Sequence, residues 1–171
     1  VAAAMAYSFD TNLEHIRHGL RTFNTSFFQA PGRMNVFDEH PFKVILDYGH
    51  NPAAIQTVCE TVDLMDTAGR SLVVLAAPGD RRDQDIIDIA KNAAGHFDHY
   101  FCKADDDRRG RSDDEVPLMQ QKTLIEAGVK PEQISVIPDE QACINEALEA
   151  AEPGDLLVVF GDNIIRCWKQ I

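Results

Sequence analysis

Short apolar runs that alternate with helical patterns are the feature that most constrains how this sequence can fold. Residues 71–77 form a continuous apolar run, and residues 156–160 form another. Such runs are expected of strands that are covered by helices on both faces. Between them, apolar residues recur at helical spacing, as Ile55, Val58 and Val62 do. The alternation predicts βαβ crossovers and a largely parallel sheet between helices.

We therefore predict an α/β fold, namely a three-layer, Rossmann-like domain with about six strands. The strands are expected over residues 34–37, 42–46, 71–77, 99–102, 134–137 and 156–160. The helices are expected over residues 1–8, 11–23, 51–68, 113–127, 139–151 and 164–170, with one more after Asp83 that buries Ile86, Ile87 and Phe97. The first two strands, joined by the tight connection 38–41, should form an antiparallel hairpin at an edge of the mostly parallel sheet.

Composition and charge narrow the range of partners. The formal net charge of −12 argues against nucleic acid, because a phosphate backbone is neutralised by a basic face. No window approaches the roughly 20 apolar residues that span a membrane, and residues 1–7 lack the features of a signal peptide. The cysteines have no zinc-like spacing, so we expect reduced, mostly buried thiols. We expect a cytoplasmic protein with no nucleic-acid or membrane partner.

The two helices expected at the start of the chain raise a separate question. Leu13, Ile16 and Leu20 share one face of the second helix, but two helices alone cannot bury both of their apolar sides. The chain also opens at Val1 inside a helical pattern and without a methionine. We interpret the sequence as a piece of a longer protein, in which these helices pack on the domain or on a missing partner.

A candidate site lies where an apolar strand meets the start of a helix. Side chains at the carboxyl ends of parallel strands project into a crevice beside exposed helix N–H groups. Asp47 could accept hydrogen bonds from a ribose diol or orient a cation, or it could be a capping or turn carboxylate. His50 could bind a phosphate or a carboxylate, or it could be a satisfied turn residue. Arg33 follows a rigid Pro-Gly turn, and its guanidinium suits phosphate oxygens or an adenine face.

Two further loops at predicted strand ends carry charges of both signs. A zwitterionic amino acid needs a guanidinium for its carboxylate and carboxylates for its ammonium group, and such loops would supply both. A solvated loop held by internal salt bridges would give the same sequence. The residues are Asp80, Arg81 and Arg82 in one loop and Asp107, Arg108 and Arg109 in the other. Because the loops at the carboxyl ends of a parallel sheet share one rim, we expect these two loops and the loop from Asp47 to His50 to bring their charges to a shared crevice.

The sequence contains no self-sufficient phosphate-binding loop. Neither Gly-x-Gly-x-x-Gly nor Gly-x-x-x-x-Gly-Lys-Ser/Thr occurs in it. If this domain handles a nucleotide, another segment must hold most of the phosphates.

The ordered motifs resemble those of a known family. Pro31-Gly-Arg33, a hairpin and Asp47-Tyr-Gly-His-Asn-Pro52 look like the start of the C-terminal domain of the Mur ligase family. Within that family, four further segments resemble cyanophycin synthetases: Asn35-Val-Phe, Pro78-Gly-Asp-Arg-Arg-Asp83, Asp107-Arg-Arg-Gly110 and Pro153-Gly-Asp-Leu156. The similarity covers residues 27–168, and residues 1–26 look like the tail of a preceding ATPase domain. It implies a boundary between a tail, 1–26, and a Mur ligase C-terminal domain, 27–171.

The resemblance implies an ATP-dependent amide ligase, in which ATP and Mg²⁺ phosphorylate a carboxylate and the amine of an amino acid attacks the acyl phosphate. For a cyanophycin-synthetase-like protein, the amino acid is expected to be arginine and the acceptor an aspartate-containing peptide. Carried over by position, Arg33, Asp47, His50 and Asn51 would bind the nucleotide, and 107–109 would face the amino acid.

The same resemblance implies several partners outside this chain. One is the central ATPase domain of the same polypeptide, which would supply the phosphate loop and most Mg²⁺ ligands. Another is the peptide acceptor. A homo-oligomer is one expected state of the full-length protein, and the fragment alone is expected to be inactive. Two departures from the family pattern are Gly49 in place of alanine and Phe160-Gly-Asp-Asn163 in place of Gly-Lys-Gly-His.

Three alternatives remain open from sequence alone. The domain could be a structural or oligomer-forming remnant of a related synthetase, or it could belong to another Mur or folylpolyglutamate type of ligase. A receiver-like regulatory module is the third, but it needs a lysine on a late strand, which residues 156–160 lack.

Overall fold

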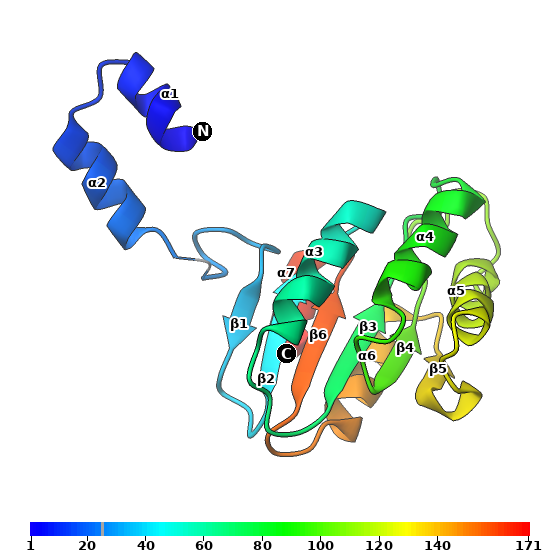
Figure 1. The fold of residues 1–171 in the computed structure, drawn as a ribbon. Coiled ribbons are helices and arrows are strands. Elements are labelled where there is room, and N and C mark those ends of the chain that lie inside the picture. Colours follow the sequence, from blue (N-terminus) through cyan, green and yellow to red (C-terminus); the bar gives the residue numbers. More distant parts are fainter. Residues whose placement is uncertain (25) are drawn as a thin grey trace.

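The computed structural model describes residues 1–24 and 26–171. Its centre is a six-stranded sheet with the strand order β1-β2-β6-β3-β4-β5 (Figure 1). The strands are β1 (Asn35–Phe37), β2 (Lys43–Asp47), β3 (Ser71–Leu75), β4 (His99–Cys102), β5 (Ile134–Val136) and β6 (Leu156–Phe160). β1 pairs with β2 in antiparallel fashion, and the other neighbours pair in parallel. The predicted mostly parallel sheet with an N-terminal hairpin at its edge is confirmed.

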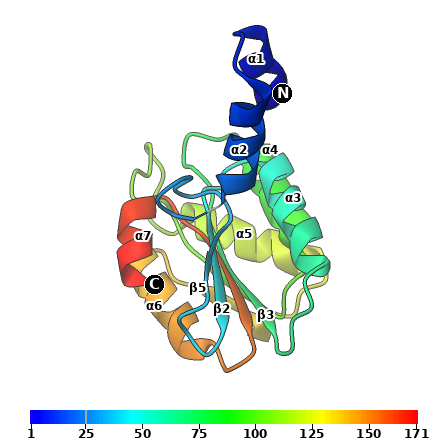
Figure 2. The same ribbon diagram turned by 90° about the vertical axis from the view of Figure 1, so that its left-hand side faces the viewer.

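Helices cover both faces of this sheet, which gives the three predicted layers (Figure 2). The helices are α1 (Ala2–Ser8), α2 (Leu13–Thr22), α3 (Pro52–Asp63), α4 (Asp83–Ala93), α5 (Glu115–Glu126), α6 (Glu140–Ala150) and α7 (Ile164–Gln170), with a short 3-10 turn at Pro131–Gln133. α3, α4 and α5 bury their apolar residues on one face of the sheet, and α6 and α7 cover the other.

Alternation along the strands explains why the sheet has two cores. In β6, Val158 joins the cluster under α3, α4 and α5, whereas Leu157 and Val159 join the cluster under α6 and α7. All five residues of this strand are buried, because it is the central strand between β2 and β3. The result agrees with a continuous apolar run, since side chains on both faces of a doubly covered strand are removed from water.

The first two helices stand apart from this body. Figure 1 shows α1 and α2 next to each other and projecting away from the sheet, and neither helix contains a buried residue. Phe9, Leu20 and Phe23 are each more than half exposed. The sequence argument that these two helices cannot bury their own apolar sides is therefore consistent with the structure, and their role as the tail of another domain stays a prediction.

Two local predictions were wrong. α3 ends at Asp63 rather than near Ala68. The turn that follows brings Gly69 against residues 154–155, where the Gly69 N–H donates to the Gly154 carbonyl at 2.9 Å, and this contact ends the helix early. A Cβ at Gly69 would lie 2.4 Å from an Asp155 carboxylate oxygen, so the approach needs glycine. In α4, Ile89 is buried instead of Ile87, which is only partly covered.

The four cysteines agree with expectation, since each is a free and buried thiol. Burial raises the pKa of each of these thiols above its ordinary value. Among the helices of the described residues, we find none whose length and apolar character would let it cross a bilayer.

Candidate functional site

The candidate site occupies the rim at the carboxyl ends of the parallel strands. The connections from β2 to α3, β3 to α4, β4 to α5 and β6 to α7 all leave this rim. β6 lies between β2 and β3 although it is last in the chain, so neighbouring loops come from distant parts of the sequence. This arrangement is the switch in strand order at which open α/β sheets form their crevices.

The Pro-Gly-Arg turn is fixed by a buried side chain. The Asn35 side-chain oxygen accepts the Gly32 N–H at 2.7 Å, and its amide donates to the Ala30 carbonyl at 2.8 Å. Gly32 has a φ of +68°, in the left-handed region that favours glycine. The Gly32 carbonyl accepts the Tyr48 N–H at 2.9 Å, so the turn is bonded directly to the loop after β2.

Asp47 lies beneath this turn. Its Oδ2 atom accepts the Met34 N–H at 2.9 Å, and the residue is only 7% exposed. A Cβ at Gly49 would lie 2.9 Å from the Phe160 ring and 3.2 Å from Asp47 Oδ1, which explains why glycine stands where alanine was expected. Arg33 is exposed, and no hydrogen bond or ion pair within the described residues engages its guanidinium. The two residues share the rim, and the structure does not bring their charged groups into contact.

His50 and Asn51 lie in the same loop with different roles. The His50 Nδ1 atom lies 2.9 Å from the Tyr48 carbonyl, which can only accept, so Nδ1 carries a proton and Nε2 is left for another partner. The Asn51 side-chain oxygen accepts the Ala54 N–H at 3.0 Å and caps α3, as its position before Pro52 predicts. The capping role thus belongs to Asn51 and not to Asp47.

The two Asp-Arg-Arg loops lie side by side and pair with each other. Arg109 Nη1 lies 2.7 Å from Asp80 Oδ2, and its Nε lies 3.1 Å from Asp107 Oδ2. Arg82 instead bonds Asp85 on its own helix, and it is 81% exposed. The two loops therefore meet each other, with the internal salt bridges of the alternative interpretation, and no hydrogen bond or ion pair among the described residues joins either loop to Asp47. For Arg108, the partner is Asp113, at 3.1 Å.

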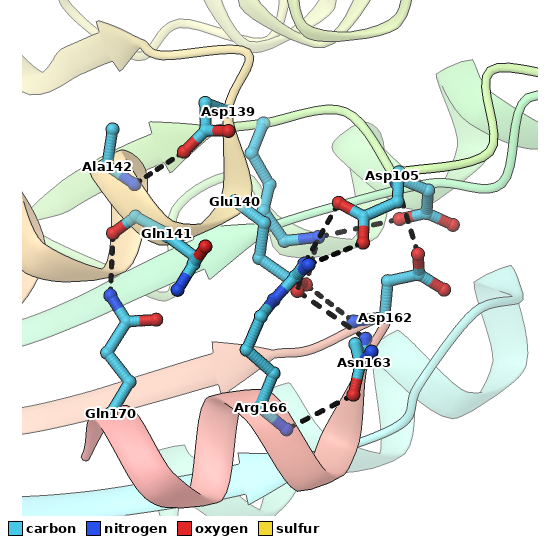
Figure 3. A network of polar contacts seen from close by, with 11 residues as sticks. Asp105, Asp139, Glu140, Gln141, Ala142, Asp162, Asn163, Arg166 and Gln170 are labelled. Carbon is cyan, nitrogen blue, oxygen red and sulfur yellow. Dashed lines mark hydrogen bonds and ion pairs between the residues drawn. The ribbon is translucent and has the colours of Figure 1, made fainter.

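Sequence reasoning missed a buried ion pair beside these loops. Lys103 and Glu140 are both fully buried, and the Lys103 Nζ lies 2.9 Å from Glu140 Oε1 and 3.5 Å from Asp105 Oδ1. Figure 3 shows the Arg166 side chain of α7 and the backbone at Asp162, in the loop before α7, directed toward Glu140. Its carboxylate also accepts the Asp162 N–H at 2.7 Å and bonds the Arg166 guanidinium. The pair was hidden because Lys103 and Glu140 lie far apart in the sequence, and nothing local to either residue shows that the fold brings them together.

The charges of this network determine its protonation states. Burial alone would raise the pKa of the Glu140 carboxyl, but Lys103, the Asp162 N–H and Arg166 outweigh it and lower that pKa to about 2. Burial opposes the charge of Lys103, yet Glu140 and Asp105 hold the Lys103 pKa above its ordinary value. Both groups are therefore charged at neutral pH. Burial raises the pKa of the Asp105 carboxyl against the attraction of Lys103.

The network ties the rim loops together through one further link. Arg166 on α7 lies 2.7 Å from Asp106 in the loop after β4, and the Asp106 N–H donates to Asp162 in the loop after β6 at 3.1 Å. The described residues contain no group of three or more His, Cys, Asp or Glu side chains arranged to hold a metal ion.

Comparison with known proteins identifies the family. The family described as Mur ligase, glutamate ligase domain, matches residues 32–163. The chain belongs to the Mur ligase family. It is 37% identical over 171 residues to a cyanophycin synthetase of Trichormus variabilis and 39% identical over 170 residues to one of Synechocystis. Each match covers 99% of this chain and 19% of the relative, so the chain spans about a fifth of the length of these Mur ligase relatives.

Solved structures agree on the fold. A UDP-N-acetylmuramoyl-L-alanyl-D-glutamate–2,6-diaminopimelate ligase matches with a TM-score of 0.67 and 19% identity, over 99% of this chain and 36% of that one. The E. coli FolC complex with DHPP and ADP matches with a TM-score of 0.66 and 21% identity, over 86% of this chain and 31% of that one. Both the predicted resemblance to the Mur ligase family and the predicted fold are confirmed.

Proposed function

We propose that this chain is the C-terminal domain of an ATP-dependent amide ligase of the cyanophycin synthetase kind. In this proposal it helps to bind ATP and the incoming amino acid, expected to be arginine, for attack on an acyl phosphate. The relatives that resemble the whole chain are synthetases, and their identity of 37% and 39% supports the same chemistry. The observation that carries the proposal is the pair of hydrogen bonds, Tyr48 N–H to Gly32 and Met34 N–H to Asp47, that seats the Arg33 turn above Asp47.

The nucleotide half of the site uses groups of complementary chemistry. Arg33 has a guanidinium free of internal partners among the described residues, and it suits phosphate oxygens or the adenine face. Asp47 has one carboxylate oxygen engaged by Met34, and the other is an acceptor for a ribose hydroxyl. His50 directs Nε2 away from its own loop carbonyl, so it can bind a phosphate when protonated. Asn51 contributes by holding the first turn of α3.

The amino-acid half of the proposed site uses the two paired loops. Asp80 and Asp107 would receive the ammonium group, and the guanidinium groups of Arg81, Arg108 and Arg109 would receive the carboxylate. Arg109 already bridges Asp80 and Asp107, so a zwitterionic ligand would replace these two internal ion pairs with contacts to its own two charged groups. Arg82 would only add positive charge near the amino acid, because its Nε and Nη2 atoms already donate to the two carboxylate oxygens of Asp85.

The remaining parts of the reaction are proposed to lie outside this chain. The E. coli FolC structure, which shares the fold, is a complex with DHPP and ADP, and we propose that the longer protein uses ATP with Mg²⁺. The phosphate loop and the Mg²⁺ ligands would come from a central ATPase domain, for which residues 1–26 would be the connecting tail. Catalysis would need both domains to close and exclude water, so the chain alone should not hydrolyse ATP. We place the protein in the cytoplasm.

The test uses the complete polypeptide that carries this domain, with ATP, Mg²⁺, a peptide acceptor and each amino acid in turn. ADP release and the mass of the product are measured. We expect ADP release that depends on arginine, and a product heavier by one arginine residue. If no amino acid stimulates ADP release and no amide forms, the proposal is wrong.

A non-catalytic remnant is the second candidate function. The dense internal salt bridges of the two Asp-Arg-Arg loops favour it, because charges already paired need no ligand. Under this alternative, replacing Arg33 or Asp47 leaves polymer synthesis by the complete polypeptide unchanged. Under the ligase proposal, the same replacements raise the KM for ATP.

A further inference from the structure

All three guanidinium nitrogens of Arg111 are engaged, and two of them, Nε and Nη2, reach across to the other Asp-Arg-Arg loop. Its Nε donates to the Gly79 carbonyl at 2.8 Å, and its Nη2 donates to the Arg81 carbonyl at 2.9 Å. Nη2 also lies 2.7 Å from Asp83, and Nη1 lies 2.5 Å from Glu115. The side chain is only 16% exposed, so these partners, rather than water, occupy its donors.

These bonds cross between elements that are distant in the sequence. Gly79, Arg81 and Asp83 belong to the connection from β3 into α4, whereas Arg111 and Glu115 belong to the connection from β4 into α5. A planar guanidinium with donors in a fixed fork can satisfy two carbonyls and two carboxylates at once. A lysine ammonium presents its donors from a single point and cannot bridge that span. The geometry is therefore specific for arginine.

The backbones of the same two loops also meet without a side chain between them. A Cβ at Gly79 would lie 2.3 Å from the Arg108 carbonyl oxygen, so the two chains are in direct contact there. The Gly79 carbonyl that Arg111 binds therefore belongs to the residue at the closest approach. Asp80 on one loop and Arg109 on the other are joined by an ion pair, with 2.7 Å between Oδ2 and Nη1. Any movement of Arg111 would change the spacing of these two side chains.

We propose that Arg111 is a positioning residue for the incoming amino acid. Its own donors are engaged within the protein, so it acts by holding Asp80, Arg81, Arg108 and Arg109 at the separation that a zwitterion requires. The inference rests on the proposed function and adds a residue to it. Because a displacement of about 1 Å can cost up to about a hundredfold in rate, loss of the clamp should weaken the use of the amino acid while leaving the nucleotide half intact.

The experiment compares Arg111→Lys and Arg111→Gln with Arg70→Lys in the complete polypeptide. Arg70 is a matched control because it also binds a carboxylate and a carbonyl, Asp155 and Ala150, but at the opposite rim of the sheet. We expect both Arg111 variants to raise the KM for the amino acid by roughly tenfold or more and to leave the KM for ATP within about twofold. Arg70→Lys should leave both KM values near those of the parent protein.

Amide hydrogen exchange on the same variants supplies a readout that does not need turnover. Amides of residues 79–83 and 106–113 should exchange faster in the Arg111 variants, while those of residues 48–51 should not change. Unchanged exchange in both loops would overturn the clamp, whatever the activity. An equal rise in both KM values, or the same effect from Arg70→Lys, would also overturn it.

Asp80→Asn and Arg109→Gln separate this inference from the proposed function. If these direct variants raise the KM for the amino acid and the Arg111 variants do not, the clamp is wrong and the proposed function stands. If none of the variants changes that KM, the amino-acid assignment of the proposed function is wrong as well.

Discussion

Replacing Lys103 with methionine tests whether the buried ion pair holds the rim together. Lys103 and Glu140 are both fully buried, and their charged groups lie 2.9 Å apart. Methionine fills much of the lysine volume, so the main loss is the charge that compensates Glu140. Removing one partner of a buried pair costs about 3–5 kcal/mol, because the other charge is left without compensation. Arg166 and the Asp162 N–H still contact Glu140, so we expect a loss near the lower end, about 3 kcal/mol.

A double-mutant cycle makes this expectation quantitative. Glu140→Gln should cost a similar amount, because it leaves Lys103 with only Asp105, at 3.5 Å. The double variant removes both charges, and it should lose about 1–3 kcal/mol less than the sum of the single variants. Denaturant unfolding can be followed by the fluorescence of Trp168, the single tryptophan. Its ring stacks on Phe27, with the two ring centroids 4.1 Å apart. Free energies of unfolding that add within about 0.5 kcal/mol would refute the reasoning.

The pH dependence of the same variants gives an independent check. The Glu140 carboxyl has its pKa lowered from 4.5 to about 2 in the folded chain, so its contribution to stability is present above pH 4.5 and is lost as the pH falls towards 2. In Lys103→Met, Glu140 can be protonated at a higher pH, which relieves the unpaired charge. The difference in unfolding free energy between parent and variant should therefore shrink as the pH falls below about 4.5. A difference that stays constant from pH 7 to pH 3 would contradict this assignment.

Two substitutions test the local geometry of the rim loops. Asn51→Ala removes the cap on α3 and should cost about 1 kcal/mol in unfolding free energy, measured by denaturant titration; no loss would mean that the cap contributes nothing. Gly79→Ala places a Cβ 2.3 Å from the Arg108 carbonyl oxygen and should lower the free energy of unfolding by about 1–3 kcal/mol. Gly19→Ala is the control, because a Cβ there would have no atom within 4 Å, and it should not destabilise the protein. Equal melting temperatures for the two alanine variants would contradict the close approach.

The fold could be predicted from sequence because each strand and helix has its own periodic signature. The run 156–160 is apolar throughout, and the strand that it forms is buried on both faces. The strand order was harder, since nothing local shows that this last strand inserts between β2 and β3. The end of α3 was also misplaced, because contact with Gly154, which is distant in sequence, decides it.

The candidate site residues stay a prediction, and the sequence shows only some of the polar groups that lie at the rim. Arg33, Asp47 and His50 are recognisable because they flank turns at strand ends, where chemistry is expected. Lys103 and Glu140 were missed because the sequence around each one describes a solvated loop and a helix start, and only the folded sheet brings them together. Arg111 was missed as an individual residue because a charged loop does not show which of its arginines is buried. Long-range pairing is the information that a single sequence lacks.

The central claim is that Asp47 and the Arg33 turn form the nucleotide half of a ligase site, and the KM for ATP of Asp47→Asn in the complete polypeptide tests it most directly. Asparagine keeps the size and can still accept the Met34 N–H, but it loses the charge of the acceptor offered to a ribose. A hydrogen bond to a charged group contributes about 1.5–3 kcal/mol, so we predict a KM for ATP raised about tenfold to a hundredfold with an unchanged melting temperature. Asp38→Asn is the control, because Asp38 is exposed at the other end of the same hairpin. This substitution should leave the KM for ATP unchanged. A KM for ATP that is the same in Asp47→Asn as in Asp38→Asn would contradict the account.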